Sequence, residues 1–322
     1  MHYRRLGKSG LKVSEISLGS WITFGSQVGT DTAKKLIHAA YDAGINFFDN
    51  ADVYASGKAE VEMGKAIKDL PRESLVLSSK VFWPTMPGPN GRGLSRKHIT
   101  ESINASLKRL GVDYLDLYFC HRFDPDTPMD EIVRTMDNLV QQGKILYWGT
   151  SEWRAWQISS AFCSANSHHL VAPTMEQPQY NMFHRRRVET ELAPIWKEYG
   201  IGITTWSPLY GGILSGKYNK GVPAGSRAAM EKMDWFKDRI TKDRLVIVQD
   251  LEEIAGDLGI SVAQLAIAWL LRRKEVSSVI TGASKLKQLK QNIESADAVQ
   301  NLTDDVLERI EQVLGNHPDE DE

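Results

Sequence analysis

The sequence reads LVLSSK at residues 75–80, YLDLYFC at residues 114–120 and LYWG at residues 146–149. Each run is short and rich in aliphatic, β-branched or aromatic residues, which is typical of buried β-strands. Two longer segments, Ser95–Leu110 and Pro128–Gln142, lie between them and carry apolar residues three to four positions apart. That spacing is typical of amphipathic helices, so the stretch predicts parallel strands joined by right-handed helical crossovers.

The same alternation continues along the chain. We predict strands at Ile16–Leu18, Asn46–Asp49, Leu75–Lys80, Tyr114–Cys120, Leu146–Gly149, Thr174–Gln177, Ile203–Trp206 and Ser278–Thr281. We predict helices at Asp31–Ala43, Ala59–Lys68, Ser95–Leu110, Pro128–Gln142, Ala155–Asn166, Val188–Tyr199 and Val262–Arg273. Asp31 and Ser95 are expected to cap their helices, because their side-chain oxygens can accept from free backbone N–H groups.

The number and spacing of the strands favour a closed barrel. Successive strand ends at 49, 80, 120, 149, 177 and 206 lie 28 to 40 residues apart, near the size of one β-helix-β unit. The last step, from 206 to 281, is longer and is expected to hold a loop insertion and an extra helix. Because no G-x-G-x-x-G follows the first strand, a doubly wound sheet is disfavoured. We predict one α/β domain over residues 1–316, a (β/α)₈ TIM barrel with extended βα loops and an extra C-terminal helix, before an acidic tail at 317–322.

Composition limits the classes of function. The 322 residues are 42% hydrophobic and 25% charged, which suits a globular core rather than disorder. A formal net charge of −2 provides no bulk attraction for nucleic acid or anionic membranes. The two cysteines, the charged N-terminus and the lack of an 18-residue apolar run predict a cytoplasmic protein without a membrane span. His168 and His169 have no partner at metal-ligand spacing, so no metal site is expected.

Polar residues collect where the predicted strands end, which is where active sites form in this fold. Asp49, Lys80 and His121 follow or end consecutive strands, and Tyr54 lies five residues beyond Asp49. Ser151, Gln177, Trp206 and Ser207 hold the corresponding positions after the next three strands.

This set of residue types suits proton donation to a carbonyl oxygen. A free tyrosine has a pKa of about 10, and a lysine ammonium nearby is expected to lower that pKa for Tyr54. Asp49 would hold Lys80 charged, and His121 would orient the carbonyl by a hydrogen bond. Taken singly, Asp49 and Lys80 also fit a structural ion pair, Tyr54 a loop aromatic and His121 a core histidine. Their joint position at one rim favours the functional interpretation.

The loop after the seventh predicted strand can meet phosphate. Its sequence GGILSGKY, at residues 211–218, differs from the P-loop pattern because Tyr218 replaces the Ser/Thr that would hold Mg²⁺, so ATP hydrolysis is disfavoured. Gly211 and the glycines after it let backbone approach a pyrophosphate, and Lys217 and Arg227 can pair with phosphate charge. The alternative is a surface lid whose cations are only solvated.

Several longer strings resemble the aldo-keto reductase superfamily over about residues 3 to 314. They are LGKSGLKVS (6–14), FDNADVY (48–54), LDLY (115–118), GTS (149–151), WSPL (206–209) and GAS (282–284). The strings GRGLSRKHI (91–99), YWGTS (147–151) and GILSGKY (212–218) resemble its potassium-channel β-subunit branch in particular. The resemblance implies a (β/α)₈ barrel that uses NADPH to reduce aldehydes and ketones.

The resemblance also implies roles for residues. Tyr54 would be the general acid, Asp49 and Lys80 would tune it, and His121 would orient the carbonyl. The implied NADPH/NADP⁺ contacts are Ser20, Trp21, Gln27, Asp49, Ser151, Gln177, Trp206, Ser207, Pro208, Leu209, Gly211, Lys217, Arg227, Gly282, Ser284, Gln288, Gln291 and Asn292. Close members often carry glutamate where Gln291 stands, and Glu152 receives no role.

Two functions are compatible with the resemblance. One is an enzyme that reduces small carbonyl substrates, and the other is an NADPH-binding channel accessory subunit with slow turnover. Channel β-subunits usually carry asparagine where this chain has His121, and often a long N-terminal extension, whereas the barrel pattern here begins near Met1. Both differences favour the enzyme. A homotetramer would be consistent with the branch.

Overall fold

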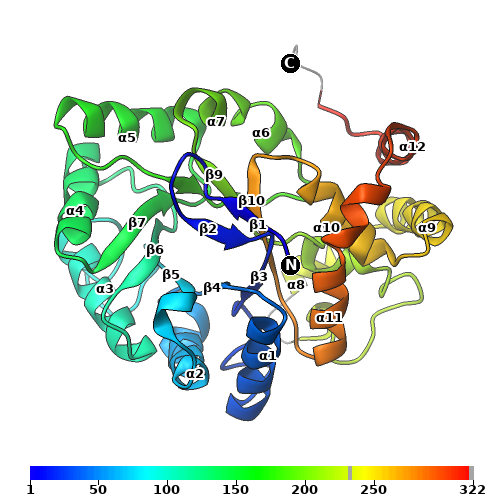
Figure 1. Cartoon of the computed structure of the whole chain (residues 1–322), viewed down its shortest axis with the longest axis horizontal. Coiled ribbons are helices and arrows are strands. Elements are labelled where there is room, and N and C mark those ends of the chain that lie inside the picture. Colours follow the sequence, from blue (N-terminus) through cyan, green and yellow to red (C-terminus); the bar gives the residue numbers. More distant parts are fainter. Residues whose placement is uncertain (231–233, 319–322) are drawn as a thin grey trace.

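A closed barrel of parallel strands forms the centre of the molecule (Figure 1). The computed structural model describes residues 1–230 and 234–318, and within them eight strands close in the order β10-β3-β4-β5-β6-β7-β8-β9. These strands are β3 (Ile16–Gly19), β4 (Phe47–Asp49), β5 (Val76–Val81), β6 (Leu115–Cys120), β7 (Ile145–Thr150), β8 (Met175–Glu176), β9 (Gly202–Thr205) and β10 (Val276–Thr281). Every predicted strand is therefore confirmed, with ends that differ by at most two residues, and so is the (β/α)₈ TIM barrel.

Helices surround the barrel, as the apolar spacing predicts (Figure 1). They include α1 (Thr30–Asp42), α2 (Lys58–Ile67), α3 (Arg96–Leu110), α4 (Met129–Gln141), α5 (Ala155–Ser167) and α10 (Val262–Leu271). The predicted cap on α3 is confirmed, because the Ser95 hydroxyl accepts from the His98 N–H at 3.2 Å. The predicted cap on α1 is wrong: Gly29 is the N-cap, and Asp31 lies inside the first turn, where its charge still favours the helix N-terminus.

One predicted helix is wrong as a single element. Val188–Tyr199 was expected to be continuous, but the structure has α6 (Arg186–Glu189) and α7 (Ala193–Tyr199). Pro194 lies in the first turn of α7, where its missing N–H costs nothing. Inside a longer helix the same proline would clash with the carbonyl four residues earlier, so the helix is interrupted before Pro194.

The long connection after β9 and the segment after β10 carry the expected additions. The connection holds the 3₁₀ turns η3 (Tyr210–Ser215) and η4 (Arg227–Ala229), then α8 (Asp234–Lys237) and α9 (Lys242–Asp257), before α10. After β10 come α11 (Leu286–Glu294), η5 (Asp297–Asn301) and the extra C-terminal helix α12 (Asp304–Leu314). Of the tail predicted at 317–322, residues 319–322 lie outside the described residues.

An N-terminal hairpin, which the sequence did not lead us to predict, lies across one end of the barrel (Figure 1). Its strands β1 (Tyr3–Arg5) and β2 (Lys12–Ser14) are antiparallel, and Leu6 and Val13 join an apolar cluster with the barrel residues Phe47 and Leu117. Gly7 in the turn has φ +56°, and a Cβ there would lie 2.4 Å from the Gly200 carbonyl oxygen. The hairpin thus closes the end opposite the carboxyl ends of the strands.

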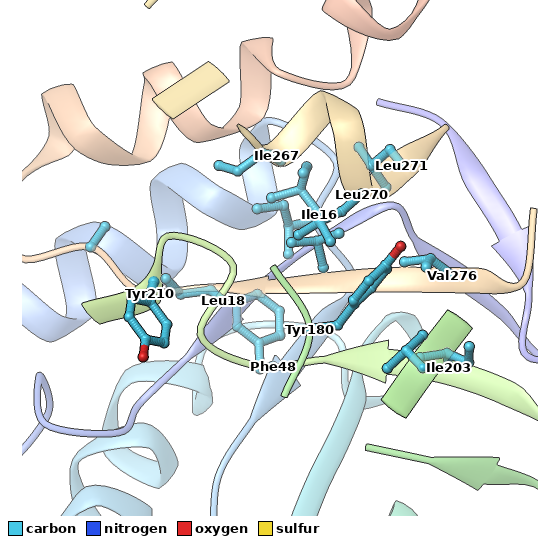
Figure 2. Close-up of a cluster of buried hydrophobic side chains, with 14 of the residues drawn as sticks. Ile16, Leu18, Phe48, Tyr180, Ile203, Tyr210, Ile267, Leu270, Leu271 and Val276 are labelled. Atoms are coloured by element: carbon cyan, nitrogen blue, oxygen red, sulfur yellow. The ribbon is translucent and has the colours of Figure 1, made fainter. Parts of the chain in front are cut away.

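Successive side chains of each barrel strand point alternately outward to the helices and into the barrel. Outward side chains such as Leu77 and Val81 of β5 belong to the large core between strands and helices. Figure 2 shows part of that core, where Ile16, Val276 and Leu270 gather beside α10. Because side chains alternate, Lys80 points to the opposite side of β5, into the barrel. The period-2 pattern therefore places Lys80 inside the barrel at the end of its strand.

Within the described parts of the chain, no helix taken singly is long and apolar enough to cross a membrane. Only α9 and α10 together reach that length and composition, and the pair is bent by 85° at its break.

Candidate active site

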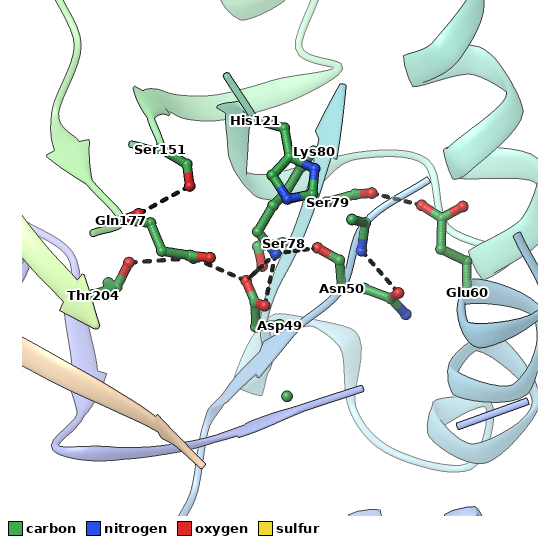
Figure 3. A network of polar contacts seen from close by, with 12 residues as sticks. Asp49, Asn50, Glu60, Ser78, Ser79, Lys80, His121, Ser151, Gln177 and Thr204 are labelled. Atoms are coloured by element: carbon green, nitrogen blue, oxygen red, sulfur yellow. Dashed lines mark hydrogen bonds and ion pairs between the residues drawn. The ribbon is translucent and has the colours of Figure 1, made fainter. Parts of the chain in front are cut away.

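A buried ion pair lies inside the barrel where β4 and β5 end (Figure 3). The Lys80 ammonium donates to both Asp49 oxygens, at 2.8 and 2.7 Å, and to the Asn50 carbonyl at 2.5 Å. The Ser78 hydroxyl donates to the same Asp49 carboxylate at 2.8 Å. Burial lowers the pKa of Lys80, and the Asp49 carboxylate opposes that shift. The structure thus brings together Asp49 and Lys80, two of the residues singled out in the sequence.

Two more predicted residues extend this network towards β9. The Gln177 amide donates to Asp49 Oδ1 at 3.1 Å and to Thr204 Oγ1 at 3.4 Å. The Ser151 hydroxyl donates to the Gln177 carbonyl oxygen at 2.9 Å. Polar groups of β4, β5 and β9 and of the residues directly after β7 and β8 thus meet across the barrel in one hydrogen-bonded set (Figure 3).

Tyr54 and His121 lie beside the ion pair. Tyr54 begins the 3₁₀ turn η1 (Tyr54–Gly57), and the centre of its ring is 5.0 Å from Lys80 Nζ and 5.9 Å from the centre of the His121 ring. Ala55 and Ser56, directly after Tyr54, have φ angles of +49° and +54°. Non-glycine residues rarely adopt this backbone, and the strain it stores is typical of functional loops. All four predicted catalytic residues therefore lie at one rim.

The expected effect of Lys80 on the pKa of Tyr54 is wrong. Burial and the Asp49 carboxylate raise the pKa of Tyr54 well above its usual value, and Arg122 is the cation that opposes them. Lys80 does not reverse this shift: its ammonium lies 5.0 Å from the centre of the Tyr54 ring, but it also lies 2.7 Å from the Asp49 carboxylate. The phenol of Tyr54 therefore keeps its proton at neutral pH and is available as a proton donor.

His121 is neutral at neutral pH. Burial lowers its pKa well below the usual value, and the charges of Lys80 and Arg122 lower the pKa further. The imidazole is 7% exposed, and its Nδ1 has no hydrogen-bond partner in the portion of the chain that the structure describes. A neutral imidazole carries one N–H donor, which suits a hydrogen bond to a carbonyl oxygen.

Two residues near this rim, Arg122 and Glu152, were given no role from the sequence. Arg122 directly follows His121, and that position at a strand end was the available signal. Glu152 has φ +61° and accepts at Oε1 from the Trp206 indole N–H, 2.9 Å away. Its Oε2 pairs with Arg187 at 2.6 Å. Glu152 therefore holds the indole of Trp206 in place. The two residues follow different strands, β7 and β9, so only the fold brings them into contact.

A second buried acidic group lies behind the Tyr54 loop. Both oxygens of Glu60 are bonded, one to the Ser79 hydroxyl and the other to Arg109, each at 2.6 Å. Among the described residues neither oxygen of Asp52 accepts a hydrogen bond of good geometry, although the Ser102 hydroxyl and the Val53 N–H lie close enough to lower its pKa. Burial and the charge of Glu60 raise the pKa of Asp52 from its ordinary 3.8 to about 8. With a pKa of about 8, Asp52 keeps its proton at neutral pH.

The first barrel loop meets the loop after β9. The Trp21 ring lies 5.9 Å from that of Trp206 and 6.4 Å from that of Tyr54, and Arg227 lies 5.0 Å above it. The hydroxyl of Ser20 is buried and has no partner in the described ranges. Gln27 contacts Met230, which is three residues beyond Arg227. The structure thus brings the predicted residues of these two loops together.

The loop after β9 suits an anionic group. Ser207 accepts from the Gly211 N–H at 3.2 Å, and Pro208 and Leu209 lie between them in the same turn. Burial lowers the pKa of Arg227 to about 10. Partial burial and the Arg227 charge lower the pKa of Lys217 to about 8, although the Lys217 side chain is still exposed to solvent. Neither cation has a carboxylate partner among the described residues. A phosphate would relieve this cost, so these residues fit a phosphate-bearing cofactor.

The remaining predicted residues follow β10, which lies between β9 and β3 in the barrel. Ser284 donates to the Gln288 side chain at 2.9 and 3.1 Å, and the Asn292 amide donates to the Gly282 carbonyl at 3.4 Å. The Gln291 carbonyl accepts from Ser295, within α11. These contacts stay inside the β10–α11 segment. The β10–α11 segment lies beside the loops that follow β3 and β9, because β10 is between these two strands in the barrel.

No metal centre is built from acidic, histidine or cysteine side chains in residues 1–230 and 234–318.

Comparison with known proteins gives a consistent result. The family model described as the aldo/keto reductase family matches residues 15–314. Two relatives, from Arabidopsis thaliana and Oryza sativa subsp. japonica, are each described as a probable voltage-gated potassium channel subunit beta. They are 51% and 50% identical to this chain, and each match covers 99% of this chain and 98% of the relative.

Proposed function

This chain belongs to the aldo/keto reductase family, and from that premise we propose that it reduces aldehydes and ketones with NADPH. The observation that carries the proposal is the buried Asp49–Lys80 pair with its ammonium 5.0 Å from the ring of Tyr54, beside the neutral imidazole of His121. A phenol and an imidazole N–H at one point can bind and protonate a carbonyl oxygen.

Each residue has a distinct part in the proposed reaction. His121 donates a hydrogen bond that positions the carbonyl oxygen beside Tyr54. When bound, NADPH supplies the hydride for the carbonyl carbon. The phenol of Tyr54 gives its proton to that oxygen, because the oxygen becomes a far stronger base as it gains charge. Lys80 and Asp49 position the phenol, and the Arg122 charge favours the phenolate that remains.

The residues that would hold the cofactor would bind different chemical groups of it. Lys217 and Arg227 would meet the phosphates, including the 2′-phosphate that separates NADPH from NADH. Trp206 would stack on the nicotinamide, and Ser151 and Gln177 would bind its carboxamide. Lys217 and Arg227 have no carboxylate partner within residues 1–230 and 234–318, and this supports a phosphate-bearing ligand in that loop.

The test is NADPH oxidation with a panel of aldehydes and ketones, comparing wild type with Tyr54→Phe. We expect Tyr54→Phe to lower kcat/KM by about 10²–10⁴-fold, because only the proton donor is lost. NADPH should still raise the Tm of the variant as it does for wild type. Tyr199→Phe is the matched control, since Tyr199 stacks on Phe162 in the outer layer. Near wild-type activity of Tyr54→Phe would end the general-acid assignment.

A channel accessory role is the second candidate, favoured by the printed names of the two relatives. Because those relatives are matched over 98% of their own length, chain length does not separate the two functions. Binding of the purified chain to a detergent-solubilised voltage-gated potassium channel tests this role, and no binding would remove it. The sequence also predicts a single domain over residues 1–316, a cytoplasmic location and a homotetramer, and these three remain predictions.

A further inference from the structure

A half-buried guanidinium lies at the candidate active site and pairs with no carboxylate of residues 1–230 and 234–318. Arg122 donates through Nη1 to the His121 carbonyl oxygen and, at 3.5 Å, to the Ser151 hydroxyl. Its Nε and Nη2 make no hydrogen bond with any residue in the described ranges. A guanidinium carries five N–H donors, so three of the five remain for a ligand.

The nearby acids are already engaged elsewhere. Glu152 binds Arg187 at 2.6 Å and the Trp206 indole, and Glu176 receives the Thr150 hydroxyl and lies 3.6 Å from Arg187. Burial lowers the pKa of Arg122 even though Glu152 and Tyr54 oppose the shift. An anionic ligand would stabilise this charge, which is partly desolvated and forms no ion pair in the described part of the chain.

The surroundings of Arg122 place it on the substrate side of the rim. Its guanidinium carbon lies 5.7 Å from the ring centre of Trp83, which is 36% exposed and lies 6.4 Å from the His121 ring. His121 in turn contacts Tyr54, the proposed proton donor. A molecule held by Tyr54 and His121 would therefore reach both the indole and the guanidinium.

We propose that Arg122 binds a carboxylate of the substrate, so that the preferred substrates are small aldehydes or ketones that carry a carboxylate. This inference rests on the proposed function. One planar guanidinium matches the two oxygens of a carboxylate, whereas a doubly charged phosphate is usually met by several cations. Trp83 would cover the apolar part of the same molecule.

The test compares two matched substrate series in NADPH oxidation by the full chain. The 2-, 3- and 4-formylbenzoates carry a carboxylate, and the corresponding formylbenzamides have nearly the same shape without the charge. We expect wild type to prefer at least one formylbenzoate over its amide by roughly 10- to 100-fold in kcat/KM. Arg122→Gln should remove this preference through KM, and Arg122→Lys should keep part of it. Arg134→Gln, an equal charge loss on the exposed face of α4, should keep the preference in full.

Binding measured without turnover separates the two proposals. In the presence of NADP⁺, formylbenzoate should raise the Tm of wild type more than formylbenzamide does, and this difference should vanish in Arg122→Gln. If that holds but no aldehyde is reduced, the carboxylate site stands and the reductase fails. If both series are reduced equally by wild type, or Arg122→Gln slows both by the same factor, the carboxylate site is wrong.

Discussion

Replacing Asp52 with asparagine should stabilise the protein, and by an amount that grows with pH. Asp52 is 2% exposed, and its two oxygens accept no hydrogen bond of good geometry from the described residues, whereas both oxygens of its neighbour Glu60 are hydrogen-bonded. The folded chain therefore holds a proton on Asp52 at neutral pH. In the unfolded chain the same carboxyl ionises freely, and this release favours unfolding.

The magnitude follows from the shift of the Asp52 pKa from 3.8 to about 8. Between these values the folded state binds the extra proton, so the free energy of unfolding falls by about 1.4 kcal/mol for each pH unit gained. The cost is absent below pH 3.8 and complete above pH 8. At pH 7 it amounts to about 4 kcal/mol, and it is about 2 kcal/mol larger at pH 8 than at pH 6. Asparagine does not ionise, so Asp52→Asn should recover these amounts.

Urea unfolding followed by tryptophan fluorescence at pH 6, 7 and 8 measures the effect, with wild type and Asp52→Asn compared at equal m-value. Glu60→Gln is the contrasting variant in the same cluster. It removes the carboxylate that binds Arg109 at 2.6 Å, so it should destabilise the protein by about 1–3 kcal/mol. A stabilisation by Asp52→Asn that does not change with pH, or a loss of stability at all three values, would refute the protonation assigned here.

Two further predictions concern the proposed cofactor site. Glu152→Ala should weaken NADPH binding about 5-fold, because Trp206 loses the acceptor of its indole N–H, whereas Glu152→Gln keeps an acceptor oxygen and should bind NADPH like wild type. Fluorescence titration measures both, and equal losses would exclude a role through the indole. Arg227→Gln should weaken NADPH binding about 10-fold or more while NADH affinity stays the same, whereas Lys220→Gln, an exposed cation in the same loop, should change neither. The same titrations measure this, and an equal loss for both cofactors would exclude a 2′-phosphate contact at Arg227.

Local periodicity was sufficient to predict the barrel. Strand runs such as Leu75–Lys80 and the glycine-terminated helix Ser95–Leu110 depend on side-chain spacing that is visible in the chain itself. The hairpin at Tyr3–Ser14 was not predicted, because its three-residue strands are stabilised by packing of Leu6 and Val13 into the barrel end. Local pattern also did not predict the break before Pro194, although proline itself was the available signal.

The types of residue at the strand ends were also apparent in the chain, because parallel strands bring their carboxyl ends to one rim. Their ionisation was not apparent, since it depends on which charges lie close together after folding. Burial and the Asp49 carboxylate raise the pKa of Tyr54, and burial and the Glu60 charge raise the pKa of Asp52. The contact of Glu152 with Trp206 joins residues 54 positions apart. Periodicity is a property of neighbours along the chain, whereas charge pairing and burial arise between segments that meet only in the folded molecule.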